Sequence, residues 1–474
     1  MVNGTSRPAH AVLTSPTTQR GAHEGAHGYA PAMRRALPVS CAVAVLLAAI
    51  LVGVGSAGAE VRYPNDGSLR LNQLQVMGTH NSFHRRPNPQ FIDALVTALP
   101  GFASVVAEWD YEQLPLTDGF ADQGVRQIEL DVWADPAGTI FSDRKSYEWA
   151  GLPADPGIPE LHEPGIKVLH IHEVDVEATC WTFVTCLDEV KAWSDANPGH
   201  APVTILVEAK QDVVLDLFGL GYAPIVPWDA TQLQTIDDEI RSVFAPEDLI
   251  TPDDVRGARA TLEEAVLTDG WPTLAESRGK VLFALDNGGG VQNAYLAGHP
   301  SAQGRVLFPS GSEPGHPETA FIKYNDPIGD FAKIQSAVAA GYIVRTRADA
   351  NPTQTNPSLF ADRDQALASG AQFVSTDYPV PDPIREAEHP ERTTPYFVQM
   401  PGGTPTRCNP ISAPETCTAS DIENPAWLAP EPEPTTTTTA GPTTTGPPGT
   451  IGPENAIPST PPATPVVVNP RLAG

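Results

Sequence analysis

Short apolar runs recur along the middle of the chain, and longer segments with helical spacing separate them. This alternation constrains the fold most strongly, because strands that alternate with helices pair in parallel through right-handed crossovers. About eight such strands favour an α/β fold of the (β/α)8 TIM-barrel type. An open doubly wound sheet is the alternative, but no glycine-rich phosphate loop follows the first strand. The expected strands are residues 74–80, 125–133, 166–172, 202–210, 280–287, either 305–310 or 320–326, 342–349 and 371–379.

Composition divides the chain into four parts. Residues 1–32 are interpreted as a dispensable leader or an upstream mis-start. Residues 33–59 have the pattern of a signal peptide, and residues 60–420 are expected to form a single barrel domain. Residues 421–474 are rich in proline and threonine, so we expect a disordered tail. Helices are expected at residues 88–99, 182–197, 230–244, 327–341 and 363–370.

The segment that begins at Met33 has the three parts of a secretory signal. Arg34 and Arg35 are followed by an apolar run and then by small residues up to Ala59. Cleavage near Ala59 would make the protein secreted. A retained membrane anchor is the alternative, but the run is short for a membrane span and ends in small residues.

The cysteines fit an exported protein. Removal of the signal would remove Cys41 and leave four of the five cysteines. An even number in an oxidising compartment predicts disulfides. We expect local pairs, Cys180–Cys186 and Cys408–Cys417. A zinc site is disfavoured because the spacings differ from zinc motifs and no histidines are interleaved.

The chain is strongly acidic, with 57 acidic and 29 basic residues and a formal net charge of −28. This balance argues against nucleic-acid binding and against a polybasic membrane patch. It suits a soluble protein, or one that gathers cations.

Oxygen-bearing side chains gather where the expected strands end, which is where TIM barrels carry their chemistry. Glu129 and Asp131 are two residues apart and therefore share one strand face. Carboxylates gathered inside a barrel repel one another and lose hydration, which a divalent cation would relieve. Asn81 and Glu208 complete a set of oxygen donors that favours calcium or magnesium. Calcium fits the expected location outside the cell.

Several of these segments together resemble the bacterial calcium-dependent phosphoinositide-specific phospholipase C family. They are "MGTHNSFH", "GVRQIELDVWADP", "VLHIHEVDVEATC", "APVTILVEAK", "VRTRAD" and "FVSTDYP", and the resemblance covers about residues 70–385. It implies catalytic roles for His80 and for a histidine of the expected third strand. Position favours His170, with His172 as the alternative. The resemblance further implies that Asn81, Glu129, Asp131 and Glu208 are Ca2+ ligands.

The resemblance implies a secreted, calcium-dependent phosphodiesterase. Such an enzyme cleaves phosphatidylinositol to diacylglycerol and a (cyclic) inositol phosphate, by attack of a ring hydroxyl on phosphorus. Its partner is a phosphoinositide lipid at a membrane surface, and we expect a monomer that binds no nucleic acid. Lys210, Arg345 and Arg347 are candidates for substrate contacts, with structural salt bridges as the alternative. Candidates for contact with lipid are Phe141, Tyr147 and Trp149, unless they pack their own loop.

Two other functions are weighed against this one. A glycerophosphodiester phosphodiesterase shares the barrel and the metal, but typically has His-Arg-Gly after the first strand. Here Asn81 and Ser82 follow His80. A catalytically silent binding module on a Pro/Thr-rich stalk is the second alternative, and the intact set of acids and histidines argues against it.

Overall fold

The structure is a computed structural model that describes residues 62–350, 359–388, 390 and 394–430. The expected leader and signal peptide, and residues 431–474 of the expected tail, lie outside the described residues. Within the described ranges, none of the helices combines the length and the apolar character that crossing a bilayer requires.

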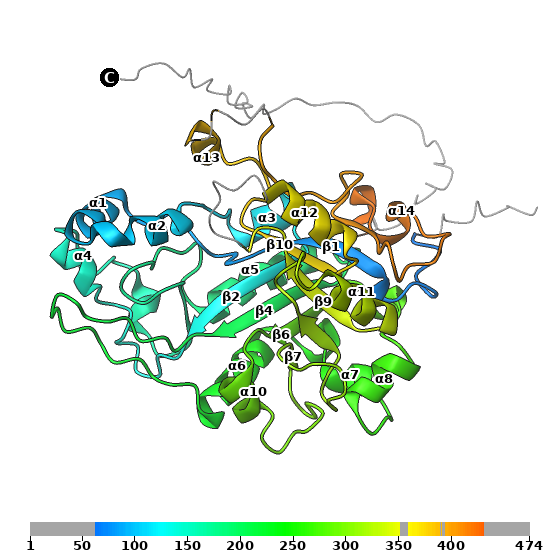
Figure 1. The fold of residues 1–474 in the computed structure, drawn as a ribbon. Helices are drawn as coiled ribbons and strands as arrows, with labels where there is room; N and C mark the ends of the chain where they lie inside the picture. The colour runs from blue at the N-terminus through cyan, green and yellow to red at the C-terminus, as the bar shows by residue number, and fades with distance from the viewer. Residues whose placement is uncertain (1–61, 351–358, 389, 391–393, 431–474) are drawn as a thin grey trace, which may run out of the picture. The chain divides into compact units, whose positions relative to one another are not determined.

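Eight parallel strands form a barrel in the order in which they occur along the chain (Figure 1). Hydrogen-bonded ladders join all neighbours except β7 and β8, where the amide of Lys323 donates to the carbonyl of Ser310 at 3.0 Å. This arrangement confirms the predicted (β/α)8 TIM-type fold. The barrel strands are β1 (Leu74–Thr79), β2 (Gln127–Trp133), β4 (Val203–Ala209), β6 (Val281–Leu285), β7 (Leu307–Pro309), β8 (Phe321–Lys323), β9 (Ile343–Arg347) and β10 (Phe373–Thr376).

The expected third strand is wrong. Within residues 166–172 only β3 (Lys167–Val168) is a strand, and it pairs antiparallel with β2 outside the barrel. The chain then turns back, with a bridge between Ile171 and Asp175. The count of eight still holds, because residues 305–310 and 320–326 each contribute a strand where only one was expected. As a result, β4 is the third barrel strand and not the fourth.

Three shorter strands, β3 among them, each pair with one strand of the barrel. β5 (Leu249–Ile250) pairs parallel with β6, and β11 (Thr406–Cys408) pairs antiparallel with the first half of β1. β11 therefore covers the end of the barrel where the parallel strands begin.

The five expected helices are all present, and three of them begin at a residue whose side chain caps the helix. The five helices are α1 (Pro89–Ala98), α5 (Phe183–Ala196), α6 (Ala230–Val243), α11 (Phe331–Ala340) and α12 (Leu359–Ala368). The side chains of Asn88, Thr182 and Asp229 accept backbone amides at the starts of α1, α5 and α6. The remaining α-helices are α2 (Ala103–Val106), α3 (Leu116–Asp122), α4 (Lys145–Trp149), α7 (Pro252–Arg256), α8 (Leu262–Thr268), α9 (Leu274–Ser277), α10 (Gly289–Tyr295), α13 (Pro383–Glu388) and α14 (Ala419–Ile422).

Short 3-10 segments connect several of these elements. They are η1 (Leu71–Gln73), η2 (Pro100–Phe102), η3 (Ala107–Trp109), η4 (Pro159–His162), η5 (Pro246–Asp248) and η6 (Pro425–Trp427).

The side chains of β2 show how the core is divided. Ile128, Leu130 and Val132 belong to one buried apolar cluster with residues of α5, such as Phe183 and Leu187. The alternate residues of β2 therefore face the interior of the barrel. This division is what places Glu129 and Asp131 together at the carboxyl end of the barrel.

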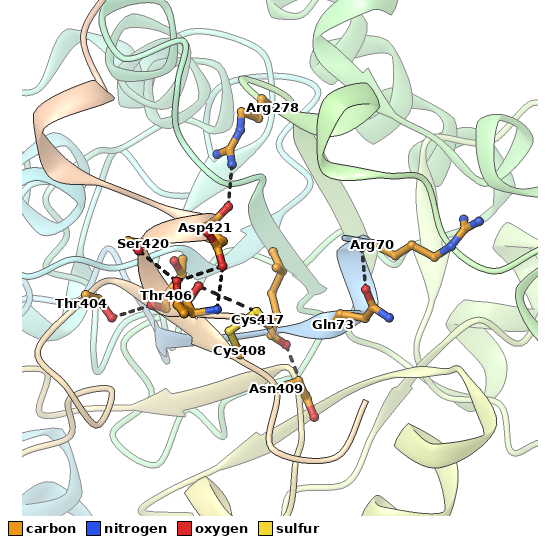
Figure 2. The surroundings of a disulfide bond; sticks show 12 residues. Arg70, Gln73, Arg278, Thr404, Thr406, Cys408, Asn409, Cys417, Ser420 and Asp421 are labelled. Carbon is orange, nitrogen blue, oxygen red and sulfur yellow. Dashed lines mark hydrogen bonds between the residues drawn. A yellow bond between two sulfur atoms is a disulfide. The ribbon is translucent and has the colours of Figure 1, made fainter. Parts of the chain in front are cut away.

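The segment after α13 closes the opposite end of the barrel. Both expected disulfides are formed, Cys180–Cys186 and Cys408–Cys417. Figure 2 shows the second disulfide together with Asp421, whose carbonyl accepts from Arg278 at 3.5 Å. Residues 421–430 were assigned to the tail, but they belong to the folded structure, because Glu423 is fully buried there.

Candidate active site

The turn after β1 is tied to β2 by hydrogen bonds. The Ser82 hydroxyl accepts the amide of Glu129 at 2.8 Å, and the Ser82 amide donates to the Glu129 carbonyl at 2.9 Å. Asn81 has a φ of 42°, a left-handed conformation that asparagine tolerates better than most residues. The strand therefore ends in a turn that places His80 and Asn81 beside the carboxylates of β2.

His80 is held by a carboxylate from the last barrel strand. Its Nδ1 lies 2.8 Å from Oδ1 of Asp377, and its Nε2 lies 3.9 Å from Oε1 of Glu129. Burial lowers the pKa of His80 well below its usual value, and Arg347 and Arg345 lower it further. The ring is therefore neutral at pH 7, with Nδ1–H donated to Asp377 and the lone pair of Nε2 directed into the site.

Three carboxylates form the centre of the site. Glu129, Glu208 and Asp286 each offer one oxygen, and these three oxygens lie within 4.8 Å of one another. Asp286, which follows β6 directly, was not predicted as a site residue. Its place at a strand end was the available signal. Lys323 binds the carboxylate of Asp286 at 2.5 Å.

Four buried oxygens in this region have no hydrogen-bond partner in the structure. They are Oδ1 of Asn81, both carboxylate oxygens of Asp131 and Oδ1 of Asp286. The other end of the Asn81 amide is fixed, because its Nδ2 donates to the Tyr111 hydroxyl at 3.1 Å. Unpartnered buried oxygens are costly. Their gathering at one place fits a site for a cation.

The electrostatics of the acids agree with a missing positive charge. Burial raises the pKa of Glu129 to about 7, against the opposing effect of Arg345, and Asp286 and Glu208 raise it further. Burial and the neighbouring Glu208 also raise the pKa of Asp131 well above its usual value. Oxygen-only donors of this kind suit a hard dication such as calcium.

A second histidine cluster lies beside this centre. Nδ1 of His170 lies 2.7 Å from Oδ2 of Asp175, and Nε2 of His84 lies 2.9 Å from the same oxygen. Burial works to raise the pKa of Asp175, but His84 and His170 outweigh it and lower the pKa to about 2. Asp175 is therefore ionised. The sequence analysis missed His84 and Asp175, although both lie within the segments that it quoted.

The structure separates the two candidate histidines of the 166–172 segment. The side chain of His170 is 18% exposed, and its charge influences His80. His172 packs instead against the rings of Trp133, Phe141 and Tyr222, and burial lowers its pKa to about 4. His170 is thus the histidine of this segment that lies next to the acid cluster.

The three candidate cations differ in their surroundings. Arg345 is buried and donates to Glu129 at 2.5 Å, as well as to Asn325 and Ser375. Arg347 donates to Asp377 at 2.9 Å. Nζ of Lys210 lies 3.4 Å from Glu208 and 3.7 Å from Asp131. Arg345 therefore holds Glu129 in place, and contact with substrate stays a prediction for all three cations.

The aromatic residues proposed for lipid contact are mostly buried. Phe141 and Tyr147 pack inside one apolar cluster, so the prediction of lipid contact is wrong for these two. Trp149 is half-buried and stacks on Phe218, with 4.5 Å between ring centroids.

One known protein family matches most of the chain. The family model for Ca2+-dependent phosphoinositide phospholipase C matches residues 69–410. No curated protein matches the chain.

Two solved structures of calcium-dependent enzymes resemble the chain at low sequence identity. The calcium-dependent phosphoinositol-specific phospholipase C of a Pseudomonas species is 18% identical, with a TM-score of 0.42, over 73% of this chain and 97% of that one. The calcium-dependent enzyme of Streptomyces antibioticus is 19% identical, with a TM-score of 0.41, over 66% of this chain and 96% of that one. Likenesses at this level add nothing to the family match. Because that match spans most of the chain, the protein belongs to the Ca2+-dependent phosphoinositide phospholipase C family and is a phosphoric diester hydrolase.

Proposed function

We propose that this protein is a secreted enzyme that cleaves phosphatidylinositol to diacylglycerol and a (cyclic) inositol phosphate, by attack of a ring hydroxyl on phosphorus. The observation that carries the proposal is the pairing of two carboxylate-bound histidines, His80 and His170, beside a group of unpartnered oxygen atoms. This arrangement supplies a proton acceptor, a proton donor and a place for a cation around one reacting phosphate.

Asn81, Glu129, Glu208 and Asp286 would hold the calcium ion, with Asp131 beside them. A bound dication supplies electrostatic stabilisation to the phosphoryl oxygens and to the attacking hydroxyl. The chain's contribution is a fixed donor set, because Arg345 and Tyr111 already hold Glu129 and Asn81 in position. A preformed site of this kind needs little reorganisation during the reaction.

His80 is suited to the role of general base. Its ring is neutral, and Asp377 accepts the proton on Nδ1, so Nε2 has a free lone pair. Nε2 takes the proton of the inositol hydroxyl next to the phosphate, and the hydroxyl oxygen forms a new bond to phosphorus. Asp377 stabilises the imidazolium that results.

His170 is suited to the role of general acid. Its Nδ1 is bound to the ionised Asp175, which stabilises a protonated ring. The ring donates its second proton to the diacylglycerol oxygen as the bond from that oxygen to phosphorus breaks. Opening of the cyclic product by water would use the same two histidines in exchanged roles.

Secretion is supported by the signal-like segment near Ala59 and by the two disulfides. Disulfides form and persist mainly in oxidising compartments. We propose release of the mature chain outside the cell as a monomer. Mass spectrometry of the N-terminus of the secreted protein would test the cleavage site.

The activity is tested with purified protein and vesicles that contain phosphatidylinositol, with calcium or with a chelator. We expect water-soluble inositol phosphate to be released only with calcium. We also expect His80→Ala and His170→Ala each to lose about two to four decades of rate. The matched control is His172→Gln, a nearby histidine outside the acid cluster, which should retain most of the rate. Activity that survives both the chelator and His80→Ala would overturn the proposal, and release of glycerol phosphate would indicate a different substrate.

A further inference from the structure

One loop presents large apolar side chains to solvent. It lies between β4 and α6, over residues 210–229. The exposed fractions are 77% for Val213, 73% for Leu215, 57% for Leu217 and 36% for Phe218. Single exposed apolar residues are common on protein surfaces, but four within six residues form a patch that marks an interaction site.

The loop has a defined internal structure that holds this tip outward. The carboxylate of Asp216 accepts the amides of Leu220 at 2.8 Å and Gly221 at 2.7 Å, which closes a turn. At the base of the loop, Nε1 of Trp228 donates to the carbonyl of Lys210 at 2.8 Å. Both the tip and the base are therefore fixed by hydrogen bonds within the loop itself.

The two halves of the loop differ in their burial. Ala223, Ile225 and Val226, on the returning half, pack against a buried apolar cluster of the domain. On the outgoing half, Phe218 stacks on Trp149 of α4, and the apolar residues before it stay exposed. The returning half of the loop is therefore packed against the core, whereas most of the outgoing half is exposed to solvent.

The exposed half lies at the rim of the candidate active site. The loop begins two residues after Glu208, one of the three clustered carboxylates, and the amide of Lys210 is bonded to the carbonyl of Val132 at the end of β2. In Figure 1, the loop leaves β4 on the side of the barrel where α1, α2 and α4 lie. A surface that meets this tip therefore also faces the site.

The charge of the loop indicates which kind of lipid surface it can bind. Residues 211–228 include two aspartates and no lysine or arginine, and the whole chain has a net charge of −28. Attraction to anionic headgroups needs basic residues near the surface. Insertion of apolar side chains into a lipid interface needs none.

We propose that residues 213–218 form a docking loop, which inserts into the interface of a zwitterionic phospholipid bilayer and brings the active site to its lipid substrate. The inference rests on the proposed function, because a site for a bilayer lipid must reach the headgroup while the acyl chains stay in the membrane. Leu215 and Leu217 are the residues that enter the interface, and Asp216 stays out of it in its turn.

The first test measures binding of the full chain to phosphatidylcholine vesicles that contain no phosphoinositide, by sedimentation in a chelator. The variant is Leu215→Ser combined with Leu217→Ser. We expect a loss of about ten- to a hundredfold in vesicle partition, because each leucine that no longer enters the lipid weakens binding by about tenfold. Binding of the wild type should change little with salt concentration.

The matched control is Leu267→Ser. Leu267 is 45% exposed on α8, at the end of the barrel where the strands begin. This placement follows because Arg70, just before β1, donates to Trp271 shortly after α8. The control should bind vesicles as the wild type does. Circular dichroism of each variant checks that the fold is intact.

A second measurement gives a positive signal. Leu215→Cys and Leu267→Cys are each introduced into the chain from residue 60 onward, which lacks Cys41, and labelled with an environment-sensitive fluorophore. Labelling is selective because the four remaining native cysteines are in disulfides. On addition of phosphatidylcholine vesicles, the label at position 215 should shift to shorter wavelength and the label at 267 should not.

The outcomes separate this proposal from the proposed function. Binding through the loop without cleavage of phosphatidylinositol would leave docking standing and remove the activity. Cleavage of vesicle substrate by the double serine variant at the wild-type rate would overturn docking. So would binding that requires anionic lipid, or self-association of the wild type that the serine variant abolishes.

Discussion

A charged side chain is buried at each end of β2, and the two side chains differ in how many hydrogen-bond partners they have. Just before the strand, the guanidinium of Arg126 is fully buried, binds Glu423 at 2.6 Å and donates to the carbonyls of Phe120 and Val125. Near the end of the strand, Asp131 is equally buried and neither of its carboxylate oxygens has a hydrogen-bond partner, although Nζ of Lys210 lies 3.7 Å away. The same strand thus has a satisfied charge at one end and an unsatisfied one at the other.

This difference distinguishes a structural charge from a functional one. When one partner of a buried ion pair is removed, the other charge is left buried without compensation, and the free energy of unfolding falls. A buried charge without partners costs stability and persists when it serves a ligand. We therefore infer that the charges at the end closed by β11 and α14 stabilise the fold, and that those at the carboxyl end of the strands serve the proposed site.

The largest expected effect separates activity from stability at the open end. Asp131→Asn should lower the calcium-dependent rate by about two to three decades, because it removes one negative charge from the proposed cation site. It should change the melting temperature measured in a chelator only little, because the smaller cost of desolvation offsets the loss of the 3.7 Å contact with Lys210. A large loss of stability without calcium would show that Asp131 is structural and would break the comparison.

The closed end should show the reverse behaviour. Glu423→Ala leaves Arg126 buried and unpaired, so the free energy of unfolding should fall by about 3–5 kcal/mol in denaturant titrations. The folded fraction should keep its normal rate. The control is Glu112→Ala, which breaks the exposed pair with Arg85 and a longer contact with Arg86 and should cost less than about 1 kcal/mol. Equal costs for the two variants would contradict the structural role of the buried pair.

The disulfide at the closed end should have a smaller effect. Replacement of Cys408 and Cys417 by serine removes a link that spans 9 residues, which should cost about 2–3 kcal/mol of unfolding free energy. Activity at low temperature should be unchanged, because the bond lies beside β11 and not at the strand ends that carry the site (Figure 2). Loss of activity at full folding would show that the two ends are coupled.

The smallest effect concerns pH at the closed end. Burial lowers the pKa of His200, just before β4, to about 4 from an ordinary value of 6.5. Between these values the unfolded chain binds more protons than the folded one, so stability is complete above pH 6.5 and falls as the pH falls towards 4. His200→Gln should remove about 1–2 kcal/mol of the difference in stability between pH 7 and pH 5. An unchanged difference would contradict this assignment.

Much of the fold follows from local pattern. The helices α1, α5, α6, α11 and α12 were predicted because their apolar spacing and capping residues are local. The inward orientation of the Glu129 and Asp131 side chains was predicted from the alternation of residues along a strand. Residues 166–172 were misassigned because a two-residue antiparallel pairing followed by a turn has the same apolar content as a short barrel strand. Periodicity does not distinguish the two.

The site was predictable only where a motif was compact. His80, Asn81 and the acids of β2 lie in short, recognisable segments. Asp286 and Asp377 are single acids at strand ends, and their roles depend on neighbours that only the closed barrel brings near. The pair of His84 and Asp175 is 91 residues apart in the chain. Such pairs are set by tertiary packing, and one sequence without its fold does not reveal them.

The central claim is that the oxygen donors gathered at the carboxyl end of the barrel hold one hard dication. A crystal structure of the protein grown with calcium, with the ion located by its anomalous signal, tests it most directly. The account predicts a single ion at about 2.3–2.6 Å from oxygens of Asn81, Glu129, Glu208 and Asp286. A site left without an ion at saturating calcium, or an ion bound away from these residues, would contradict it.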